Sequence, residues 1–124
     1  MLCLAAGAIA ASLAIDAFTL SWIHSIEKIR WEEDWRIERG ALHLIEARIR
    51  GSGAGMEPPA GAVLENGVWR YRPALPPQTL LRLTHSPHVA GYTLCNVTVC
   101  APLADHLPGL PENATIEIYP CGEK

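Results

Sequence analysis

The sequence lacks an excess of basic residues. Across 124 residues, ten lysines and arginines are outnumbered by thirteen aspartates and glutamates, which gives a formal net charge of -3. Electrostatic binding of nucleic acid requires a basic patch, so the composition argues against a nucleic-acid partner. The chain also lacks internal repeats and low-complexity tracts, and its length suits one hydrophobic core rather than two. We therefore expect residues 1–124 to form a single domain.

The N-terminal stretch is free of charge but too short to cross a membrane as a helix. Residues 1–15 are apolar and rich in alanine, whereas a helical span takes about 20 apolar residues. One interpretation is a signal-like segment with a small-residue cleavage site in residues 10–14, although the basic residues that open such a signal are absent. The other, which we favour, is a pair of buried strands over residues 2–5 and 8–14, joined at Gly7.

Long helices are not indicated, because ten glycines and ten prolines divide the chain into short segments. Apolar and polar residues alternate over residues 18–25, as they do in a strand with one buried face. Residues 31–38 fit two structures, since Trp31 and Trp35 are also spaced as neighbours on a helix that could end at Gly40. We favour a strand, because the apolar residues then share one face.

Two local patterns predict details of the β-structure. The apolar positions change parity within residues 41–50, which predicts a bulge or bend in that strand. Asn66-Gly67 favours a type I′ hairpin turn between strands at residues 62–64 and 68–71. Many short strands predict an all-β fold, either an antiparallel β-sandwich or a barrel-like fold. The remaining expected strands are residues 79–84, 92–99 and 115–119.

Four cysteines allow three disulfide connectivities, and the sequence alone does not select one. Four residues separate Cys95 from Cys100, and a chain that reverses within them brings both Cα atoms to the roughly 5.5 Å that a disulfide requires. We therefore expect Cys95 to pair with Cys100, which leaves Cys3 to join Cys121 if residues 2–5 form a strand. The alternatives are four reduced thiols in the cytoplasm, loss of Cys3 with a cleaved signal, or half of a zinc site.

Three runs of sequence carry a resemblance to a known family. They are FTLSWIHSIEK at residues 18–28, WEEDW at residues 31–35 and GSGAGMEPP at residues 51–59. Together they resemble the bacterial domain-of-unknown-function family 1850, and the similarity extends over nearly the whole chain. Genes of that family are often neighbours of TAXI-type TRAP transporters. The resemblance implies an accessory role in solute uptake, periplasmic or at the extracytoplasmic side of the membrane, with transporter components or a solute-binding protein as partners.

The candidate ligand site combines two segments. The charged residues that follow the strand at residues 18–25 are expected in an exposed loop, and functional side chains concentrate in loops held by a rigid scaffold. The glycines of residues 51–55 permit a sharp turn whose backbone N–H groups could meet an anion. We predict that the two segments lie within about 13 Å of each other, the radius of a small domain. The candidate binding residues are His24, Ser25, Glu27, Lys28, Glu33, Ser52, Gly53, Gly55 and Met56.

The residues show no motif for a cofactor or a metal ion. Residues 51–55 lack the Gly-Lys-Ser/Thr ending of a phosphate-binding P-loop. A divalent metal held by His24, Glu27 and Glu33 is an alternative, but the spacing matches neither an EF-hand loop nor a zinc motif. We therefore expect no cofactor and no metal.

A purely structural interpretation of the same residues is also open. In it, the tryptophans belong to the core and Glu32 and Asp34 merely face water. His24 and Ser25 would lie on opposite faces of a strand, which prevents a nucleophile–base pair, and no other catalytic set can be assembled. We expect a non-enzymatic accessory or small-ligand-binding protein with an unidentified ligand. The alternatives are a structural protein–protein interaction module and, for location, the cytoplasm.

Overall fold

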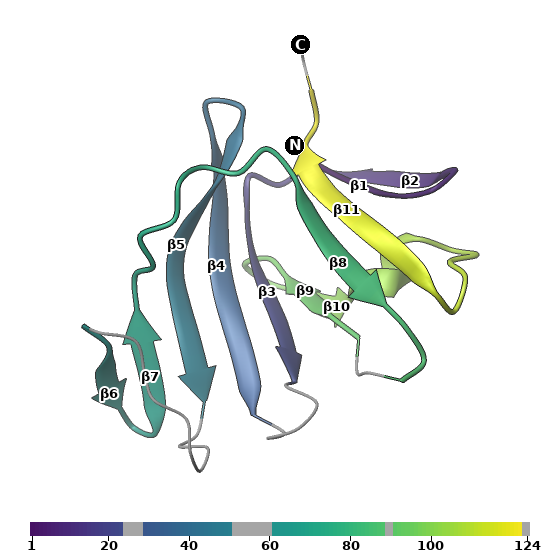
Figure 1. Cartoon of the computed structure of the whole chain (residues 1–124). Helices are drawn as coiled ribbons and strands as arrows, with labels where there is room; N and C mark the ends of the chain where they lie inside the picture. Colours follow the sequence, from purple (N-terminus) through teal and green to yellow (C-terminus); the bar gives the residue numbers. More distant parts are fainter. Residues whose placement is uncertain (24–28, 51–60, 89–90, 123–124) are drawn as a thin grey trace.

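The computed structural model describes residues 1–23, 29–50, 61–88 and 91–122, which form two antiparallel sheets packed as an open sandwich (Figure 1). In spatial order, the four-stranded sheet contains β2 (Ile9–Leu13), β1 (Leu2–Ala6), β11 (Ala114–Pro120) and β8 (Leu81–His85). The seven-stranded sheet contains β10 (Cys100–Pro102), β9 (Thr93–Cys95), β3 (Ala17–Ile23), β4 (Arg30–Glu38), β5 (Ala41–Arg50), β7 (Val68–Tyr71) and β6 (Val63–Glu65). A short 3-10 helix, η1 (Leu103–His106), follows β10. The predicted all-β sandwich is confirmed, and the described strands do not close into a barrel.

The first residues of the chain form two strands of the four-stranded sheet. β1 pairs with β2 through a turn at Gly7, whose φ of 61° suits glycine. Leu2 and Leu4 face inward and are fully buried, whereas Cys3 and Ala5, which alternate with them, are partly covered. The N-terminal stretch thus adopts the strand conformation that its apolar run favours.

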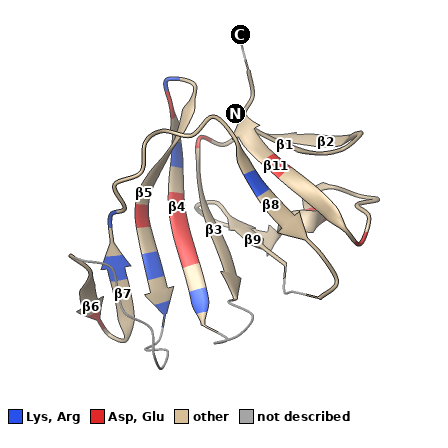
Figure 2. Ribbon diagram, in the orientation of Figure 1, with Lys and Arg blue, Asp and Glu red and all other residues tan. Residues whose placement is uncertain are grey.

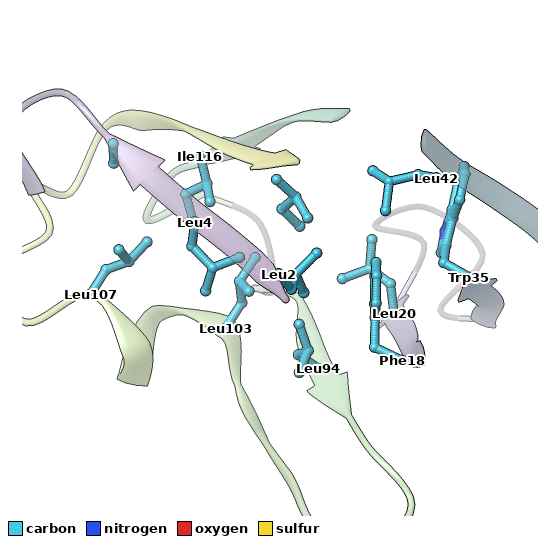
Figure 3. Close-up of a cluster of buried hydrophobic side chains, with 12 residues drawn as sticks. Leu2, Leu4, Phe18, Leu20, Trp35, Leu42, Leu94, Leu103, Leu107 and Ile116 are labelled. Atoms are coloured by element: carbon cyan, nitrogen blue, oxygen red, sulfur yellow. The ribbon is translucent and has the colours of Figure 1, made fainter. Parts of the chain in front are cut away.

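The core lies between the two sheets, as Figure 3 shows. Leucine and isoleucine side chains of β1 and β11 meet Phe18, Leu20 and Trp35 on the inner face of the larger sheet. Removing each such side chain from water contributes roughly 1.5 to 3 kcal/mol to folding. Among the described residues, the cluster includes none from β6 or β7, so the larger sheet extends beyond the area that the smaller one covers (Figure 1).

The central hairpin of the larger sheet confirms the strand interpretation of residues 31–38. In the β4–β5 pairing, Asp34 lies opposite Glu46 and Trp35 lies opposite Leu44. Ile45 is therefore an extra residue in β5, which is the bulge that the change of parity predicts. The bulge returns the leucines of β5 to the inner face.

The expected hairpin turn is present between β6 and β7. Asn66 and Gly67 have φ angles of 50° and 79°, the positive values that a type I′ turn requires at both central positions. Glu65 pairs with Val68 across it. The strands expected near the C-terminus are also present, as β8, which begins at Leu81, and as β11.

Residues 92–99 do not form one strand, so that prediction is wrong. β9 ends at Cys95 and β10 begins at Cys100. Between them, Oδ1 of Asn96 accepts hydrogen bonds from the backbone N–H groups two and three residues later, both at 2.9 Å. Asparagine side chains stabilise turns in this way, and here the local bonds reverse a chain whose apolar alternation would otherwise continue.

Two disulfides fix the hairpin and the chain ends. Cys95 pairs with Cys100 across the β9–β10 hairpin, and Cys3 pairs with Cys121, with Cα–Cα distances of 4.0 and 5.0 Å. The backbone N–H of Cys121 also donates to the carbonyl of Met1 at 3.0 Å, so the two ends lie together (Figure 1). Both expected pairings are confirmed. In the part of the chain that the structure describes, no helix is long and apolar enough to cross a membrane.

Candidate functional site

β4 divides its side chains between the two faces of the larger sheet. Glu32 pairs with Ser21 and Arg48, and these side chains share the outer face with the other even-numbered residues of the first half of β4. Glu33 pairs with Leu20 and Ala47 on the inner face. Glu32 and Glu33 are therefore neighbours in sequence but lie on opposite faces of the sheet, Glu32 among polar residues and Glu33 among apolar ones.

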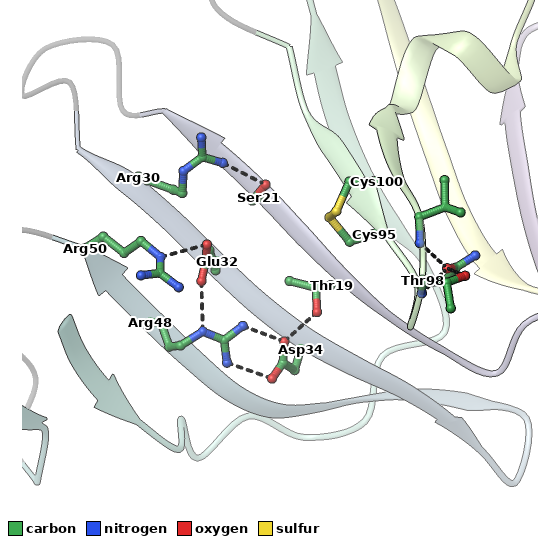
Figure 4. The surroundings of a disulfide bond; sticks show 12 residues. Thr19, Ser21, Arg30, Glu32, Asp34, Arg48, Arg50, Cys95, Thr98 and Cys100 are labelled. Carbon is green, nitrogen blue, oxygen red and sulfur yellow. Dashed lines mark hydrogen bonds and ion pairs between the residues drawn. A yellow bond between two sulfur atoms is a disulfide. The ribbon is translucent and has the colours of Figure 1, made fainter. Parts of the chain in front are cut away.

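An ionic network covers the outer face, as Figure 4 shows. Arg48 lies at its centre, with Nη1 and Nη2 binding both carboxylate oxygens of Asp34 at 2.7 and 2.8 Å. Arg48 also binds Glu32 through Nε at 2.9 Å and Glu46 through Nη1 at 2.7 Å. Bonds from Arg50 to Glu32 and from Arg70 to Glu46 extend it to neighbouring strands. The ionic network consists of Glu32, Asp34, Glu46, Arg48, Arg50 and Arg70.

The ionic network lowers the pKa of two of its carboxyl groups, those of Asp34 and Glu32. Hydrogen bonds from Arg48 hold the pKa of Asp34 below its ordinary value against the opposing effect of burial, and Thr19 adds a further bond. Burial by itself would raise the pKa of Glu32, but hydrogen bonds from Arg50 and Arg48 outweigh it and leave this pKa lowered. Three arginines balance three carboxylates, and Figure 2 shows acidic residues on β4 and β5 beside basic residues on β5 and β7. The interpretation that Glu32 and Asp34 merely face water is therefore wrong.

Glu33 has a different environment on the inner face. Its register partners are the apolar residues Leu20 and Ala47, and the indole Nε1 of Trp35 donates to its Oε1 at 3.0 Å. Burial raises the pKa of Glu33, and the single indole hydrogen bond only partly opposes this effect. Among the described residues, no arginine or lysine forms an ion pair with it. Glu33 is thus a half-buried carboxyl group without a described cationic partner.

Aromatic residues lie near this carboxyl group, because Trp22 and Trp31 form the next cross-strand pair on the same face of the sheet. Trp22 stacks on Trp31 with ring centroids 6.3 Å apart. Trp22 also contacts Tyr92, whose ring is tilted by 53° at a centroid distance of 5.5 Å. Tyr71 lies opposite Ala47, in the same row of the sheet as Glu33. Burial, and then the charge of Glu33, raise the pKa of both Tyr71 and Tyr92. We call these five partly buried residues the Glu33 site: Glu33, Trp22, Trp31, Tyr71 and Tyr92.

Of the nine binding residues expected from the sequence, Glu33 alone belongs to the described part of the chain. The other eight, in residues 24–28 and 51–56, lie outside the described residues, so their proximity stays a prediction. The residues beside these segments share one end of the sheet, because Ile23 pairs with Arg30 and Arg30 pairs with Arg50. The eight residues are His24, Ser25, Glu27, Lys28, Ser52, Gly53, Gly55 and Met56.

The metal alternative is not tested by the described residues. No group of three histidine, cysteine, aspartate or glutamate side chains placed to hold a metal ion occurs among them. The alternative set of His24, Glu27 and Glu33 includes two residues outside the described ranges.

Sequence reasoning missed Tyr92 and the arginines of the ionic network. Tyr92 was missed because one strand was expected over residues 92–99. Tyr92 instead directly precedes the short strand β9. The arginines carry a visible signal, since Arg48 and Arg50 alternate with apolar residues as Glu32 and Asp34 do. Pairing these two alternations would have suggested an ionic face on one side of the sheet.

The fold and its covalent framework define a small all-β sandwich protein with two disulfides. The chain belongs to a family of unknown function: the model described as "Domain of unknown function (DUF1850)" matches residues 18–103. The match covers all of the larger sheet except Ala17, and therefore both the ionic network and the Glu33 site. No curated protein and no solved structure matches the chain.

Proposed function

We propose that the protein is a non-enzymatic small-ligand-binding accessory of a TRAP-type solute transporter. The observation that carries the proposal is Glu33, a partly buried carboxyl group with a raised pKa that shares its face of the sheet with Trp22 and Trp31 and acts on Tyr71 and Tyr92. An ionisable group in apolar surroundings destabilises a fold unless it is paired, so such groups concentrate at functional sites. Large aromatic faces beside one polar group are also typical of small-molecule sites.

The accessory role rests on the family and on the covalent chemistry. The two disulfides support a location outside the cytoplasm, because oxidising compartments are where such bonds persist. The resemblance to the bacterial family supports a partner among transporter components or solute-binding proteins. A small ligand-binding domain in the periplasm, or at the outer side of the membrane, fits both.

Tryptophan fluorescence tests the ligand-binding role directly, since Trp22 and Trp31 belong to the Glu33 site. A panel of cationic, neutral and anionic metabolites is titrated into the wild-type protein, Glu33→Gln and Glu117→Gln. Glu117 is a matched control on the other sheet, where it pairs with Arg82. We expect saturable binding that Glu33→Gln weakens and Glu117→Gln preserves. Absence of any saturable response, or equal responses in all three proteins, would contradict the proposal.

Pull-down with transporter components and the solute-binding protein tests the accessory role separately. Protein with both disulfides intact is immobilised, and we expect it to retain at least one of these partners. Retention of none of them would contradict the association with the transporter while leaving the ligand titration as an independent result.

A second candidate function, a protein–protein interaction module, is favoured by the tip of the β9–β10 hairpin. Val97 is 97% exposed at this tip, which the disulfide between Cys95 and Cys100 and the bonds to Asn96 hold in shape. An exposed apolar side chain on a preorganised turn loses little conformational entropy on binding a partner. A cavity of about 260 Å³ beside the tip includes Phe18 in its lining.

Substitution of the tip separates the two candidates. Val97→Ser should abolish the pull-down and leave ligand fluorescence unchanged if the tip binds the partner. Leu64→Ser is the control, because Leu64 is also exposed but lies on edge strand β6. Unchanged retention of the partner by Val97→Ser would reject the tip as the interaction surface.

A further inference from the structure

We propose that the ligand of the Glu33 site is an organic cation, such as a substituted ammonium compound. The inference rests on the proposed ligand-binding function and narrows the ligand to one chemical class.

Charge complementarity is the first step. Every carboxylate of the ionic network binds at least one arginine, with distances of 2.7 to 2.9 Å. Glu33 accepts instead from the neutral indole of Trp35, and no described cationic side chain pairs with it. A carboxylate offers about four lone-pair positions, so most of its accepting capacity remains for a ligand. A bound cation would supply the positive charge that the described residues do not place beside Glu33.

The rings beside Glu33 select the kind of cation. The face of a tryptophan or tyrosine ring attracts a cation through its quadrupole, and ammonium groups with apolar substituents exploit this contact best. Trp22 contacts both Trp31 and Tyr92, and Trp22 and Trp31 lie on the same side of the sheet as Glu33. An anion at this position would face both the carboxylate and the electron-rich ring faces.

The apolar surroundings disfavour a strongly hydrated inorganic ion. The residues on either side of Glu33 in the sheet, Leu20 and Ala47, carry no oxygen ligand in their side chains. Calcium takes six to eight oxygen ligands and magnesium six, and the described residues provide no such group. A cation whose charge is shielded by methyl groups or methylenes suits a site whose described residues provide one carboxylate and several rings.

A series of isosteric probes tests the inference by calorimetry. Choline carries the charge, 3,3-dimethylbutan-1-ol replaces the ammonium nitrogen by carbon, and 3,3-dimethylbutanoate carries the opposite charge on a similar frame. Benzyltrimethylammonium extends the series to a larger cation, and calcium chloride represents a metal ion alone. We expect the ammonium probes to bind at least about tenfold more tightly than the neutral isostere, with no binding of the anion.

Variants link the preference to the residues. Glu33→Gln should bring the affinity for the cation close to that for the neutral isostere, while Glu117→Gln should leave it unchanged. Trp22→Leu should weaken the ammonium probes more than calcium, because the ring face is lost but the carboxylate stays. A cation preference that survives Glu33→Gln would overturn the assignment to this site.

The remaining outcomes distinguish this inference from the proposed function. If neither ammonium probe binds, or if the neutral or anionic isostere binds as tightly, the cation class is wrong. The ligand-binding function still stands in that case if the metabolite panel shows a saturable response that requires Glu33. Stronger binding of calcium than of the ammonium probes would assign the site to a metal ion and overturn the inference.

Discussion

Glu32 and Glu33 are neighbours in one strand, yet the two faces of the sheet treat them in opposite ways. Glu32 binds two arginines on the outer face, which hold its pKa low although it is partly buried. Glu33 points into apolar surroundings, where burial raises its pKa and where, among the described residues, it accepts a hydrogen bond from the neutral indole of Trp35. The comparison shows that the fold pairs a carboxylate with arginines where that carboxylate belongs to the structural network of the sheet. Our proposal is that Glu33, which has no cationic partner among the described residues, serves binding.

Replacing Arg48, the centre of the ionic network, should lower the free energy of unfolding more than any other change considered. Arg48→Met leaves Asp34 without its ion pair, and breaking a buried pair on one side typically costs 3 to 5 kcal/mol. We expect a loss of about 2 to 3 kcal/mol in urea unfolding, below that range because Asp34 is partly exposed. Arg36→Met is the control, since the exposed pair of Arg36 with Glu38 should contribute less than about 0.5 kcal/mol. Equal losses in both variants would show that the network adds nothing beyond ordinary surface pairs.

The hairpin that positions β7 is the next test, because β7 carries Arg70 to the outer face and Tyr71 to the inner face. Gly67→Val introduces a β-branched side chain at a φ of 79° and should destabilise the fold by about 1 to 2 kcal/mol. Gly91→Val is the control, since a Cβ there meets no atom within 4 Å and its φ is not in the left-handed region. A thermal melt of Gly67→Val that matches the wild type would argue against the turn.

Neutralising Glu32 tests how much its arginine partners on the outer face contribute to stability. Glu32→Gln weakens the bonds from Arg48 and Arg50, and charge-assisted hydrogen bonds are stronger than neutral ones. We expect a loss of about 1 kcal/mol in urea unfolding at neutral pH. A gain in stability would mean that burial, rather than the arginines, dominates at this position.

Neutralising Glu33 should raise the free energy of unfolding rather than lower it, and this change should be the smallest of the four. Glu33→Gln keeps an acceptor for the Trp35 indole but removes the buried charge, so stability at neutral pH should rise by about 0.5 to 1 kcal/mol. The same change should impair ligand binding, which is the usual trade-off at functional sites. A loss of stability in Glu33→Gln would contradict the interpretation that this carboxylate is uncompensated.

The pH dependence of that gain follows from linkage. The pKa of Glu33 is higher in the folded state, so the folded protein retains a proton that the unfolded chain releases between the ordinary and the raised value. Wild-type stability therefore falls across this window as pH rises, and the advantage of Glu33→Gln should appear there and persist above it. Tyr71 and Tyr92, which share the site, have raised pKa values and stay neutral throughout. A stability advantage of Glu33→Gln that grows as pH falls would contradict a raised pKa for Glu33.

Much of the fold is predictable because its signals are local. Alternation identifies β3 and β4, the change of parity identifies the bulge at Ile45, and Asn66-Gly67 identifies the turn before β7. The disulfide between Cys95 and Cys100 is predictable from their short separation. The disulfide between Cys3 and Cys121 then follows because these two cysteines remain. The error at residues 92–99 arose where a side-chain turn motif competed with the same alternation.

The site is less predictable because it depends on contacts between strands that are distant in sequence. Alternation places Glu33 on the face of Trp31 and Trp35, so its inward direction could be predicted. The ion pairs of Asp34 with Arg48 depend on the register of β4 against β5, which a single strand does not contain. The approach of Tyr92 to Trp22 likewise requires the pairing of β3 with β9.

A direct titration of the two neighbouring glutamates tests the central claim. The side-chain carboxyl carbons of Glu32 and Glu33 are followed by NMR across the acidic range in protein with both disulfides intact, with Glu33→Gln and Glu32→Gln confirming the assignments. The account predicts a midpoint below the ordinary glutamate value for Glu32 and above it for Glu33. Coincident midpoints, or a midpoint for Glu33 at or below the ordinary value, would contradict the claim that one face compensates its carboxylate and the other does not.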